Sequence, residues 1–288
     1  MIKITLHCLP HELDQIAWII DQLKRGARLV DPKRFILDFT LNVSDQDVDW
    51  ANSKVSKEYC IEKFNILFNR SPFINEHKVS EEHTGCNTVR RNALRADDNV
   101  THIIGLDPDL LFPETILYYI TAAVDSLKDD YYIITPQIYQ LWDTSWDIIS
   151  HPNYRNIPRD QKFWLQDPYL MFNHQPENIN LVPLPHLKFD GGWMTTYTKK
   201  LLQLVDIPDS LGHYGLDDTF VATCSNILAQ KGYNVKQYLI EDLIVMEDRV
   251  YRSEGMQPFI KLADLQSDMR NNSHVYFEQE VTKFKERV

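Results

Sequence analysis

The chain has 288 residues, of which 43% are hydrophobic and 25% charged, and its formal net charge is −11. These proportions are typical of a globular protein with a sizeable core, and no apolar run of about 18 residues predicts a membrane span. The acidic balance disfavours non-specific attraction to nucleic acid or anionic membranes. The N-terminal segment lacks the basic start and long apolar stretch of a signal peptide, so we expect a cytoplasmic protein. The scattered cysteines, without a Cys-x-x-Cys pair, predict buried thiols.

The first hundred residues alternate predicted strands and helices. Residues 2–8 and 35–41 have the pattern of strands, and residues 12–24 between them carry apolar side chains at helical spacing. Strand, helix and strand within about 40 residues predict a βαβ unit and a parallel sheet. Further helices are predicted over residues 57–68 and over the basic segment 84–96.

An acidic pair then follows a short apolar run. Residues 102–106 predict a buried strand, and Asp107 and Asp109 come directly after it with Pro108 between them. Ligands bind at the carboxyl ends of strands in open α/β sheets, and proline ends the strand alternation, which lets both carboxylates turn toward one point. Two carboxylates suit Mg²⁺ or Mn²⁺, with substrate phosphates completing the shell. The pair by itself equally fits a solvated turn that caps the next helix.

The middle of the chain differs in composition and lacks a regular hydrophobic pattern. A helix is predicted over residues 114–127 and a strand over 131–136, but from residue 137 to 185 aromatic side chains are interleaved with histidine, asparagine and proline. Such a segment suits either a surface that stacks on sugar rings or a long loop packed on the sheet.

A second group of motifs lies between residues 189 and 221. Gly191 and Gly192 permit close approach of the backbone to a ligand, and a short strand and a helix over residues 198–205 follow. Asp217 and Asp218 open the next predicted helix, where helix capping alone would also explain them. A strand over residues 234–246 and a terminal helix over 275–287 complete the chain.

The order of these motifs resembles the GT-A glycosyltransferases, especially the inverting family-two-like and galactosyltransferase-type enzymes. Asp107-Pro108-Asp109 looks like their metal-binding Asp-x-Asp, and Arg91-Asn92 like an Arg-Asn pair on the preceding helix. Gly191-Gly192 and the sequence Gly-Leu-Asp-Asp at 215–218 look like the Gly-Gly strand and the Gly-x-Gly-Glu-Asp motif. The chain departs from the pattern in having Asp-Asp for Glu-Asp, and in lacking a histidine just after the strand 234–246.

The resemblance implies a fold and a domain plan. We expect an α/β fold of the GT-A, Rossmann-like kind, with a mixed, mainly parallel sheet flanked by helices. Residues 1–250 would form one domain, with a nucleotide-sugar-binding half at 1–110, an aromatic-rich insertion at 137–187 and an acceptor-binding, catalytic half at 188–250. Residues 251–288 would form a C-terminal helical extension that covers the site, docks on the acceptor or mediates dimerisation.

It also implies roles for the acidic residues. Asp107 and Asp109 would hold Mn²⁺ or Mg²⁺, with Glu247, His274 or no protein group as the third ligand. Asp218 would be the general base, and Asp217 would hold the acceptor by hydrogen bonds. Contacts to the donor nucleotide sugar are expected from Pro10, Asp38, Asn42, Arg91, Asp107, Gly191 and Gly192.

The expected function is therefore metal-dependent transfer of a sugar from a nucleoside diphosphate sugar, with UDP-sugar favoured, to an acceptor hydroxyl with inversion. The acceptor is a glycan, a small molecule or a hydroxymethylated DNA base, the last kept open by Arg155, Arg159 and Lys162. Two other functions are open: a nucleotidyltransferase, and a non-catalytic carbohydrate-binding module. The residues after the first strand contain no glycine-rich phosphate loop, which disfavours the nucleotidyltransferase. The sequence does not predict the oligomeric state.

Overall fold

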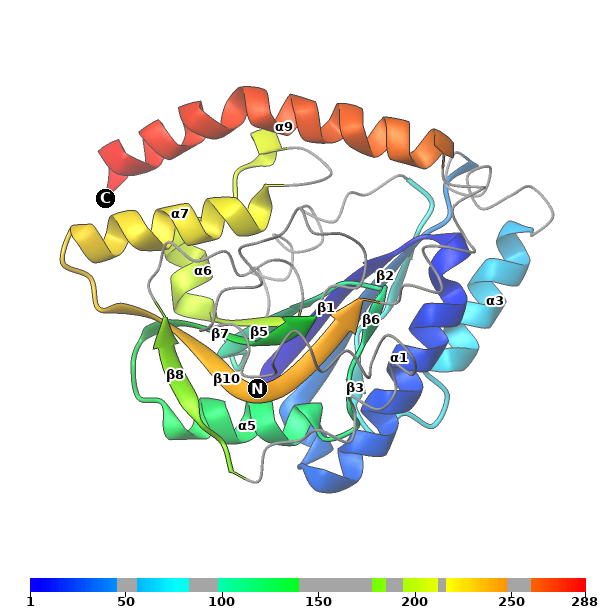
Figure 1. Ribbon diagram of the computed structural model, residues 1–288. Coiled ribbons are helices and arrows are strands. Elements are labelled where there is room, and N and C mark those ends of the chain that lie inside the picture. Colours follow the sequence, from blue (N-terminus) through cyan, green and yellow to red (C-terminus); the bar gives the residue numbers. More distant parts are fainter. Residues whose placement is uncertain (46–55, 83–97, 140–177, 185–193, 212–215, 248–259) are drawn as a thin grey trace, which may run out of the picture.

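The computed structural model describes residues 1–45, 56–82, 98–139, 178–184, 194–211, 216–247 and 260–288. The described residues form a ten-stranded sheet with helices on both of its faces (Figure 1). Among them, no helix combines the length and the apolar character needed to cross a membrane.

The N-terminal half is a parallel sheet built around β1 (Ile2–Cys8). β1 pairs in parallel with β2 (Phe35–Asn42) on one side and with β5 (His102–Leu106) on the other. α1 (Leu13–Gly26) connects β1 to β2, which confirms the predicted βαβ opening. The smaller elements of this half are η1 (Pro10–Glu12), η2 (Ala27–Leu29), η3 (Pro32–Arg34), α3 (Lys57–Leu67), β3 (Ile74–Asn75) and β4 (Lys78–Ser80).

The C-terminal half completes a mixed sheet. Its strand order is β3-β2-β1-β5-β9-β7-β10-β6, with β4 beside β2 and β8 beside β10. β9 (Thr195–Thr198) runs antiparallel to both of its neighbours, β5 and β7, whereas β7 and β10 are parallel. The sheet is thus mixed and mainly parallel, as predicted. The other elements are β6 (Leu110–Leu111), α5 (Ile116–Ser126), β7 (Tyr131–Tyr139), β8 (Leu181–Leu184), α6 (Lys199–Val205), η8 (Asp209–Leu211), α7 (Asp217–Gln230), β10 (Val235–Glu247) and α9 (Ile260–Arg287).

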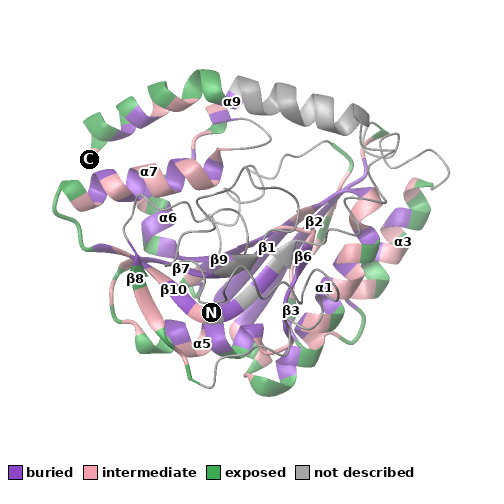
Figure 2. Ribbon diagram, in the orientation of Figure 1, coloured by how far each residue is buried: buried purple, intermediate pink, exposed green. Residues whose placement is uncertain are grey.

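The two faces of the sheet carry separate hydrophobic cores (Figures 1 and 2). On one face, alternate residues of β1 such as Ile4 and Leu6 pack with α1, α3 and α5. The other core lies between the sheet and α6 and α7, where Phe284 of α9 adds its ring. Because side chains alternate along a strand, Lys3 and Thr5 of β1 belong to this second face. Polar side chains of the central strands therefore lie on the α6–α7 side.

The cysteines within the described residues are buried and unpaired, as predicted. Cys8, Cys60 and Cys224 are free thiols, and burial raises the pKa of each of them. A thiol with a raised pKa is a poor nucleophile and a poor metal ligand, so these residues act as small apolar groups of the core.

The C-terminal helix is longer than predicted. α9 begins at Ile260, whereas the sequence pattern placed the start at residue 275. Asn271, Asn272 and Ser273, directly before the predicted start, have low helix propensity and favour turns. In the structure the buried hydroxyl of Ser273 instead donates a hydrogen bond to the backbone carbonyl of Leu211 in η8. This tertiary contact holds the helix against the body of the protein and overrides the local preference.

His102, at the opposite end of β5 from Asp107, makes the stability of the fold depend on pH. Its Nε2 lies 2.6 Å from the hydroxyl of Tyr132 and its Nδ1 2.9 Å from the hydroxyl of Thr101. Burial, and secondarily the N-terminal amino group, lowers the pKa of His102 to about 4, and burial raises the pKa of Tyr132 to about 12. The unfolded chain therefore binds a proton that the folded chain excludes between about pH 6.5 and 4.

We expect the free energy of unfolding to fall as the pH falls through this window, by about 2 to 3 kcal/mol from His102 alone. Urea unfolding of the wild type and of His102→Gln at pH 7.5 and pH 4.5 measures it. The stability difference between the two proteins should shrink at the lower pH, because the variant has no imidazole to protonate. A difference that is the same at both pH values would contradict the assignment.

Candidate active site at the carboxyl end of β5

The predicted Asp-x-Asp segment forms the turn that follows β5. β5 ends at Leu106, and Asp107, Pro108 and Asp109 are half-buried in the turn that leads to β6. β5 lies between β1 and β9, so this turn sits at the middle of the sheet rather than at its edge. The carboxylates therefore occupy the strand end that the sequence predicted.

The backbone of Glu247 lies next to this turn. β6 pairs antiparallel with the end of β10, and the register places Glu247 opposite Leu110, the residue after Asp109. The pairing brings one predicted third ligand beside the Asp-x-Asp turn at the level of the backbone; its side chain lies outside the described part of the structure.

His274, the other predicted third ligand, is an exposed residue on α9. The neighbouring Ser273 is tied to Leu211, and no contact brings His274 to the Asp-x-Asp turn among the described residues. Within those residues, no three His, Cys, Asp or Glu side chains gather into a metal-binding group. Asp107 and Asp109 could offer two carboxylates to a cation, and Mg²⁺ sites typically take one or two from the protein.

The second acidic pair opens α7. Leu216 has a φ of 64°, an uncommon left-handed conformation for a leucine, and Asp217 is the first residue of the helix. Asp217 is only 5% exposed, whereas Asp218 is half-buried. One oxygen of Asp218, Oδ1, accepts hydrogen bonds from the backbone N–H of Thr219 at 2.6 Å and from its hydroxyl at 3.2 Å. These bonds fix the orientation of the Asp218 carboxylate at the positive end of the helix.

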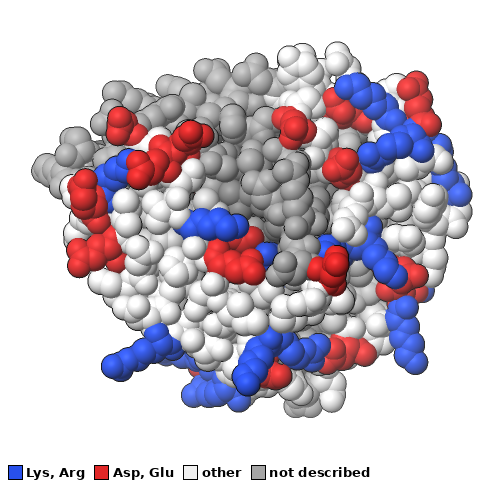
Figure 3. All heavy atoms as spheres, turned by 180° about the vertical axis from the view of Figure 1, so that it is seen from behind, with Lys and Arg blue, Asp and Glu red and all other residues white. Residues whose placement is uncertain are grey.

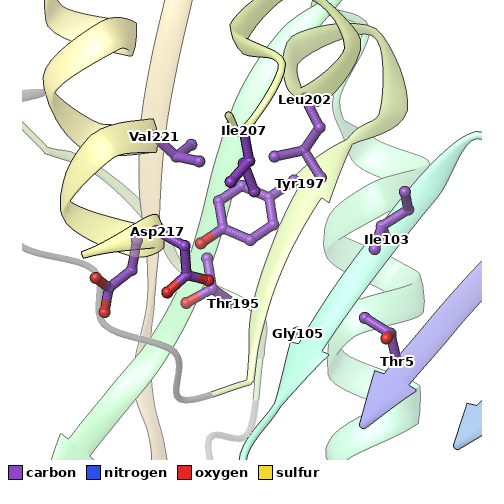
Figure 4. A pocket seen from close by; sticks show the side chains of 10 residues that line it. Thr5, Ile103, Gly105, Thr195, Tyr197, Leu202, Ile207, Asp217 and Val221 are labelled. Atoms are coloured by element: carbon purple, nitrogen blue, oxygen red, sulfur yellow. The ribbon is translucent and has the colours of Figure 1, made fainter. Parts of the chain in front are cut away.

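A pocket connects α7 with β5. Figure 4 shows side chains from the sheet and from α6 and α7 converging on it, and its volume is about 20 Å³. Gly105, two residues before Asp107, lines the same pocket as Asp217 and Asp218. The start of α7 therefore meets the end of β5 around one hollow, two residues before Asp107; neither Asp107 nor Asp109 is among the described residues that line it. The full lining is Thr5, Ile103, Gly105, Thr195, Tyr197, Leu202, Ile207, Asp217, Asp218 and Val221.

The predicted nucleotide contacts lie after β1 and along β2. Pro10 is buried in η1, directly after β1, and the buried Asn42 ends β2 with its Nδ2 2.9 Å from Nε2 of His7. Both sit at the carboxyl end of the parallel strands, Pro10 after β1, which neighbours β5, and Asn42 one strand further away.

Asp38 is placed differently. It is in the middle of β2, where its carboxylate lies 3.4 Å from Nζ of Lys3 and 3.3 Å from Nζ of Lys78. Lys3 is 4% exposed and also contacts Glu76 at 2.5 Å, so Lys3 and Asp38 form a buried ion pair that the half-buried Glu76 and the exposed Lys78 extend toward the surface. Removing one member of such a pair leaves an uncompensated charge, which gives Asp38 a structural role beside the predicted binding one.

Several predicted site residues fall outside the described structure. These are Arg91 with the basic segment 84–96, for which a helix was predicted, both Gly191 and Gly192, and the greater part of the aromatic segment. Conversely, four neighbours of the site were not predicted from sequence patterns: Thr5, His7, Thr195 and Tyr197. The alternation of polar and apolar residues in β1 was the available signal for Thr5 and His7, because it gives an interior strand one polar face.

The described elements define a class by their fold alone: a mixed α/β protein with a mainly parallel sheet, as the resemblance to the GT-A glycosyltransferases led us to expect. No family model matches the sequence, and no curated protein matches it. Solved structures that resemble it include residues 1–349 of TarS from S. aureus, with 14% identity, a TM-score of 0.49, and coverage of 98% of this chain and 70% of that one.

Two others are a mannosyltransferase from Pyrobaculum calidifontis in complex with GDP-Man and Mn²⁺, and the glucosyl-3-phosphoglycerate synthase of Mycobacterium tuberculosis in complex with Mn²⁺, UDP and glucosyl-3-phosphoglycerate. The mannosyltransferase has 14% identity, a TM-score of 0.47, and coverage of 99% and 71% of the two chains. The synthase has 14% identity, a TM-score of 0.45, and coverage of 93% of this chain and 79% of that one. At these identities, and with TM-scores under 0.5, none of the three supports an argument about substrate, metal or residue roles in this chain.

Proposed function

We propose that this protein is a metal-dependent glycosyltransferase that moves a sugar from a nucleoside diphosphate sugar, UDP-sugar first among them, to an acceptor hydroxyl with inversion. The observation that carries the proposal is the pocket shared by Gly105, two residues before the Asp-x-Asp turn, and by Asp217 and Asp218. Sugar transfer needs two acidic groups across one cleft, one side to bind the diphosphate through a cation and the other to accept the proton of the attacking alcohol.

The residues present fit a divalent cation. Asp107 and Asp109 offer hard oxygen ligands in a half-buried turn, and the backbone pairing of Glu247 with Leu110 supports Glu247 over His274 as a third ligand. When bound, Mn²⁺ or Mg²⁺ would neutralise the charge that develops on the leaving diphosphate. On the donor side, Pro10 and Asn42 would contact the nucleobase, and Asp38 would act through its ion pairs with Lys3 and Lys78. We assign Arg91, Gly191 and Gly192 to the donor by their motifs alone.

Asp218 would take the proton of the acceptor hydroxyl. Its Oδ1 is held by the N–H and hydroxyl of Thr219, so the carboxylate needs no reorientation before the proton moves. Asp217, more deeply buried beside the same pocket, would hold the acceptor by hydrogen bonds. Attack by the acceptor oxygen on the face opposite the diphosphate inverts the anomeric carbon, through an oxocarbenium-like transition state.

One contact speaks against a nucleotidyltransferase. The backbone N–H of Leu9, in the turn after β1, donates to Oε2 of Glu12 at 2.7 Å. In a phosphate-binding loop, backbone N–H groups at this position donate to the phosphate, and a carboxylate there would repel it.

The charge distribution weighs against DNA as the acceptor. Figure 3 shows acidic and basic side chains interspersed on the rear face, and several cations have carboxylate partners. Arg34 pairs with Asp125, Lys200 with Asp130, and Lys236 with Asp129. Contact with a nucleic-acid backbone relies on an excess of cations, so we favour a glycan or small-molecule acceptor over a hydroxymethylated base. The cytoplasmic location remains a prediction from the sequence.

The experiment that tests the function is a panel of nucleoside diphosphate sugars incubated with the protein and Mn²⁺, followed by detection of free UDP or GDP. We expect release of nucleoside diphosphate from one donor and thermal stabilisation by the same donor, both abolished by EDTA. A carbohydrate-binding module would be stabilised by free sugars and release nothing. Stabilisation without release, in the presence of varied acceptors, would contradict the proposal.

A further inference from the structure

The pocket between β5 and α7 has walls that suit an apolar group. On the helical side the pocket is closed by Leu202 of α6, by Ile207 in the segment after α6, and by Val221 of α7. On the sheet side it is closed by Ile103 and the ring of Tyr197. Asp217 and Asp218 border it, as Figure 4 shows for Asp217. The hollow is thus an apolar space directly beside the proposed base.

The floor of the pocket lacks a side chain. In the sheet register Gly105 pairs with Thr5 of β1 on one side and with Thr195 of β9 on the other, and all three line the pocket. Glycine inside a strand weakens it, and such a glycine often marks a place where a ligand approaches the backbone closely. Any larger residue at position 105 would fill the space between the two threonines.

Two further features single out this hollow. Thr5 is 2% exposed, and its hydroxyl has no hydrogen-bond partner in the described structure, which is unusual for a buried polar atom. Met194 and Leu216, with φ values of 57° and 64°, directly precede the pocket residues Thr195 and Asp217. Left-handed conformations of this kind cluster at functional sites, where the surrounding structure maintains them.

The size of the pocket limits what enters it. A volume of about 20 Å³ admits one water molecule or one methyl group and excludes a sugar ring. Water in a protein cavity needs two to four polar partners, whereas most of the surface that faces this pocket is apolar, although polar residues are among those that line it. The walls therefore favour a methyl group.

We propose that this pocket receives a methyl-sized apolar group on the carbon that bears the attacked hydroxyl of the acceptor. The inference rests on the proposed function and adds to it the class of acceptor: a hydroxyl with a small apolar substituent beside it. In the transfer, the acceptor oxygen forms a bond to the anomeric carbon, and the bond from that carbon to the diphosphate oxygen breaks with its electron pair. The hydroxyl proton goes to Asp218.

Simple alcohols test the pocket without knowledge of the natural acceptor. The purified protein, with Mn²⁺ and the donor it hydrolyses, is given equimolar methanol, ethanol and 1-propanol, and the alkyl glycosides are quantified by mass spectrometry. We expect ethyl over methyl glycoside by about fourfold, the value of burying one methylene group, and no further gain for 1-propanol. Product ratios within one protein do not depend on its overall activity.

Two variants change the pocket in opposite directions. Gly105→Ala places a methyl group on the floor and should reduce the ethyl-to-methyl ratio to about one. Val221→Ala widens the wall and should raise the propyl-to-ethyl ratio several-fold. Val124→Ala is the matched control, because it makes the same change in a buried helical position on the opposite face of the sheet, and its ratios should equal those of the wild type.

The outcomes separate the pocket from the function. Release of nucleoside diphosphate with alcohol ratios near one in every protein would overturn the pocket and leave the glycosyltransferase intact. A change of donor preference in Val221→Ala, with alcohol ratios unaltered, would assign the pocket to the donor sugar and overturn the acceptor assignment. No turnover of any donor would overturn both proposals.

Discussion

Asp218→Asn is expected to bind the donor as the wild type does and to transfer its sugar about 10² to 10⁴-fold more slowly. Asparagine keeps the size of the side chain and an oxygen that can accept from Thr219, so the start of α7 should stay folded. It has no carboxylate to take the proton of the acceptor. Initial rates of nucleoside diphosphate release and calorimetric titration with the donor measure the two effects separately.

The control for this variant is Asp14→Asn, which changes an exposed carboxylate of α1 that pairs with Lys63. It should leave both rate and affinity unchanged. If Asp218→Asn turns over at nearly the wild-type rate, the base lies elsewhere, and Asp217, on the same pocket, is the next residue to replace.

Asp109→Ala is expected to abolish metal-dependent turnover while the protein remains folded. Asp109 lies half-buried in a turn between two strands rather than in either core, so its loss should cost little stability. If the wild type binds Mn²⁺ and nucleotide as proposed, the two ligands at about 100 times the dissociation constant should stabilise the fold by about 2.7 kcal/mol. Thermal unfolding with and without both ligands should show this stabilisation in the wild type and none in the variant.

The same thermal-unfolding measurement, with and without Mn²⁺ and nucleotide, distinguishes the two candidate third ligands. Glu247→Gln should weaken the metal-dependent stabilisation, because the backbone at 247 pairs beside the Asp-x-Asp turn. His274→Ala should not, because α9 is held to η8 near that residue. An unchanged metal response in Asp109→Ala would remove the Asp-x-Asp turn from the proposed metal site.

The local structure was largely predictable from the sequence. The side chains of residues 2–8 alternate along the strand, and the apolar run 102–106 is bounded by turn-forming residues. The predicted and observed strands therefore agree at both ends. The helix opened by Asp217 was also placed within two residues, because the acidic pair and the following apolar spacing mark a helix N-terminus. Periodicity decides these elements, and periodicity is a property of neighbouring residues.

What sequence reasoning missed depends on register. The row Thr5, Gly105 and Thr195 joins three strands that are about 90 to 100 residues apart, and β9 runs antiparallel to its neighbours. No local pattern shows which residue of one strand lies opposite which residue of another. The ion pairs of Asp38 and the early start of α9 were hidden for the same reason, since Lys3, Lys78 and Leu211 are distant in the chain.

The central claim is that the Asp-x-Asp turn and the start of α7 are two sides of one catalytic cleft. Crystals grown with Mn²⁺ and the nucleoside diphosphate of the preferred donor test it most directly, with the metal located by its anomalous signal. The account predicts manganese bonded to a carboxylate oxygen of Asp109 or Asp107, with the diphosphate between that turn and Asp218. Manganese and nucleotide bound elsewhere, with this cleft containing only solvent, would contradict it.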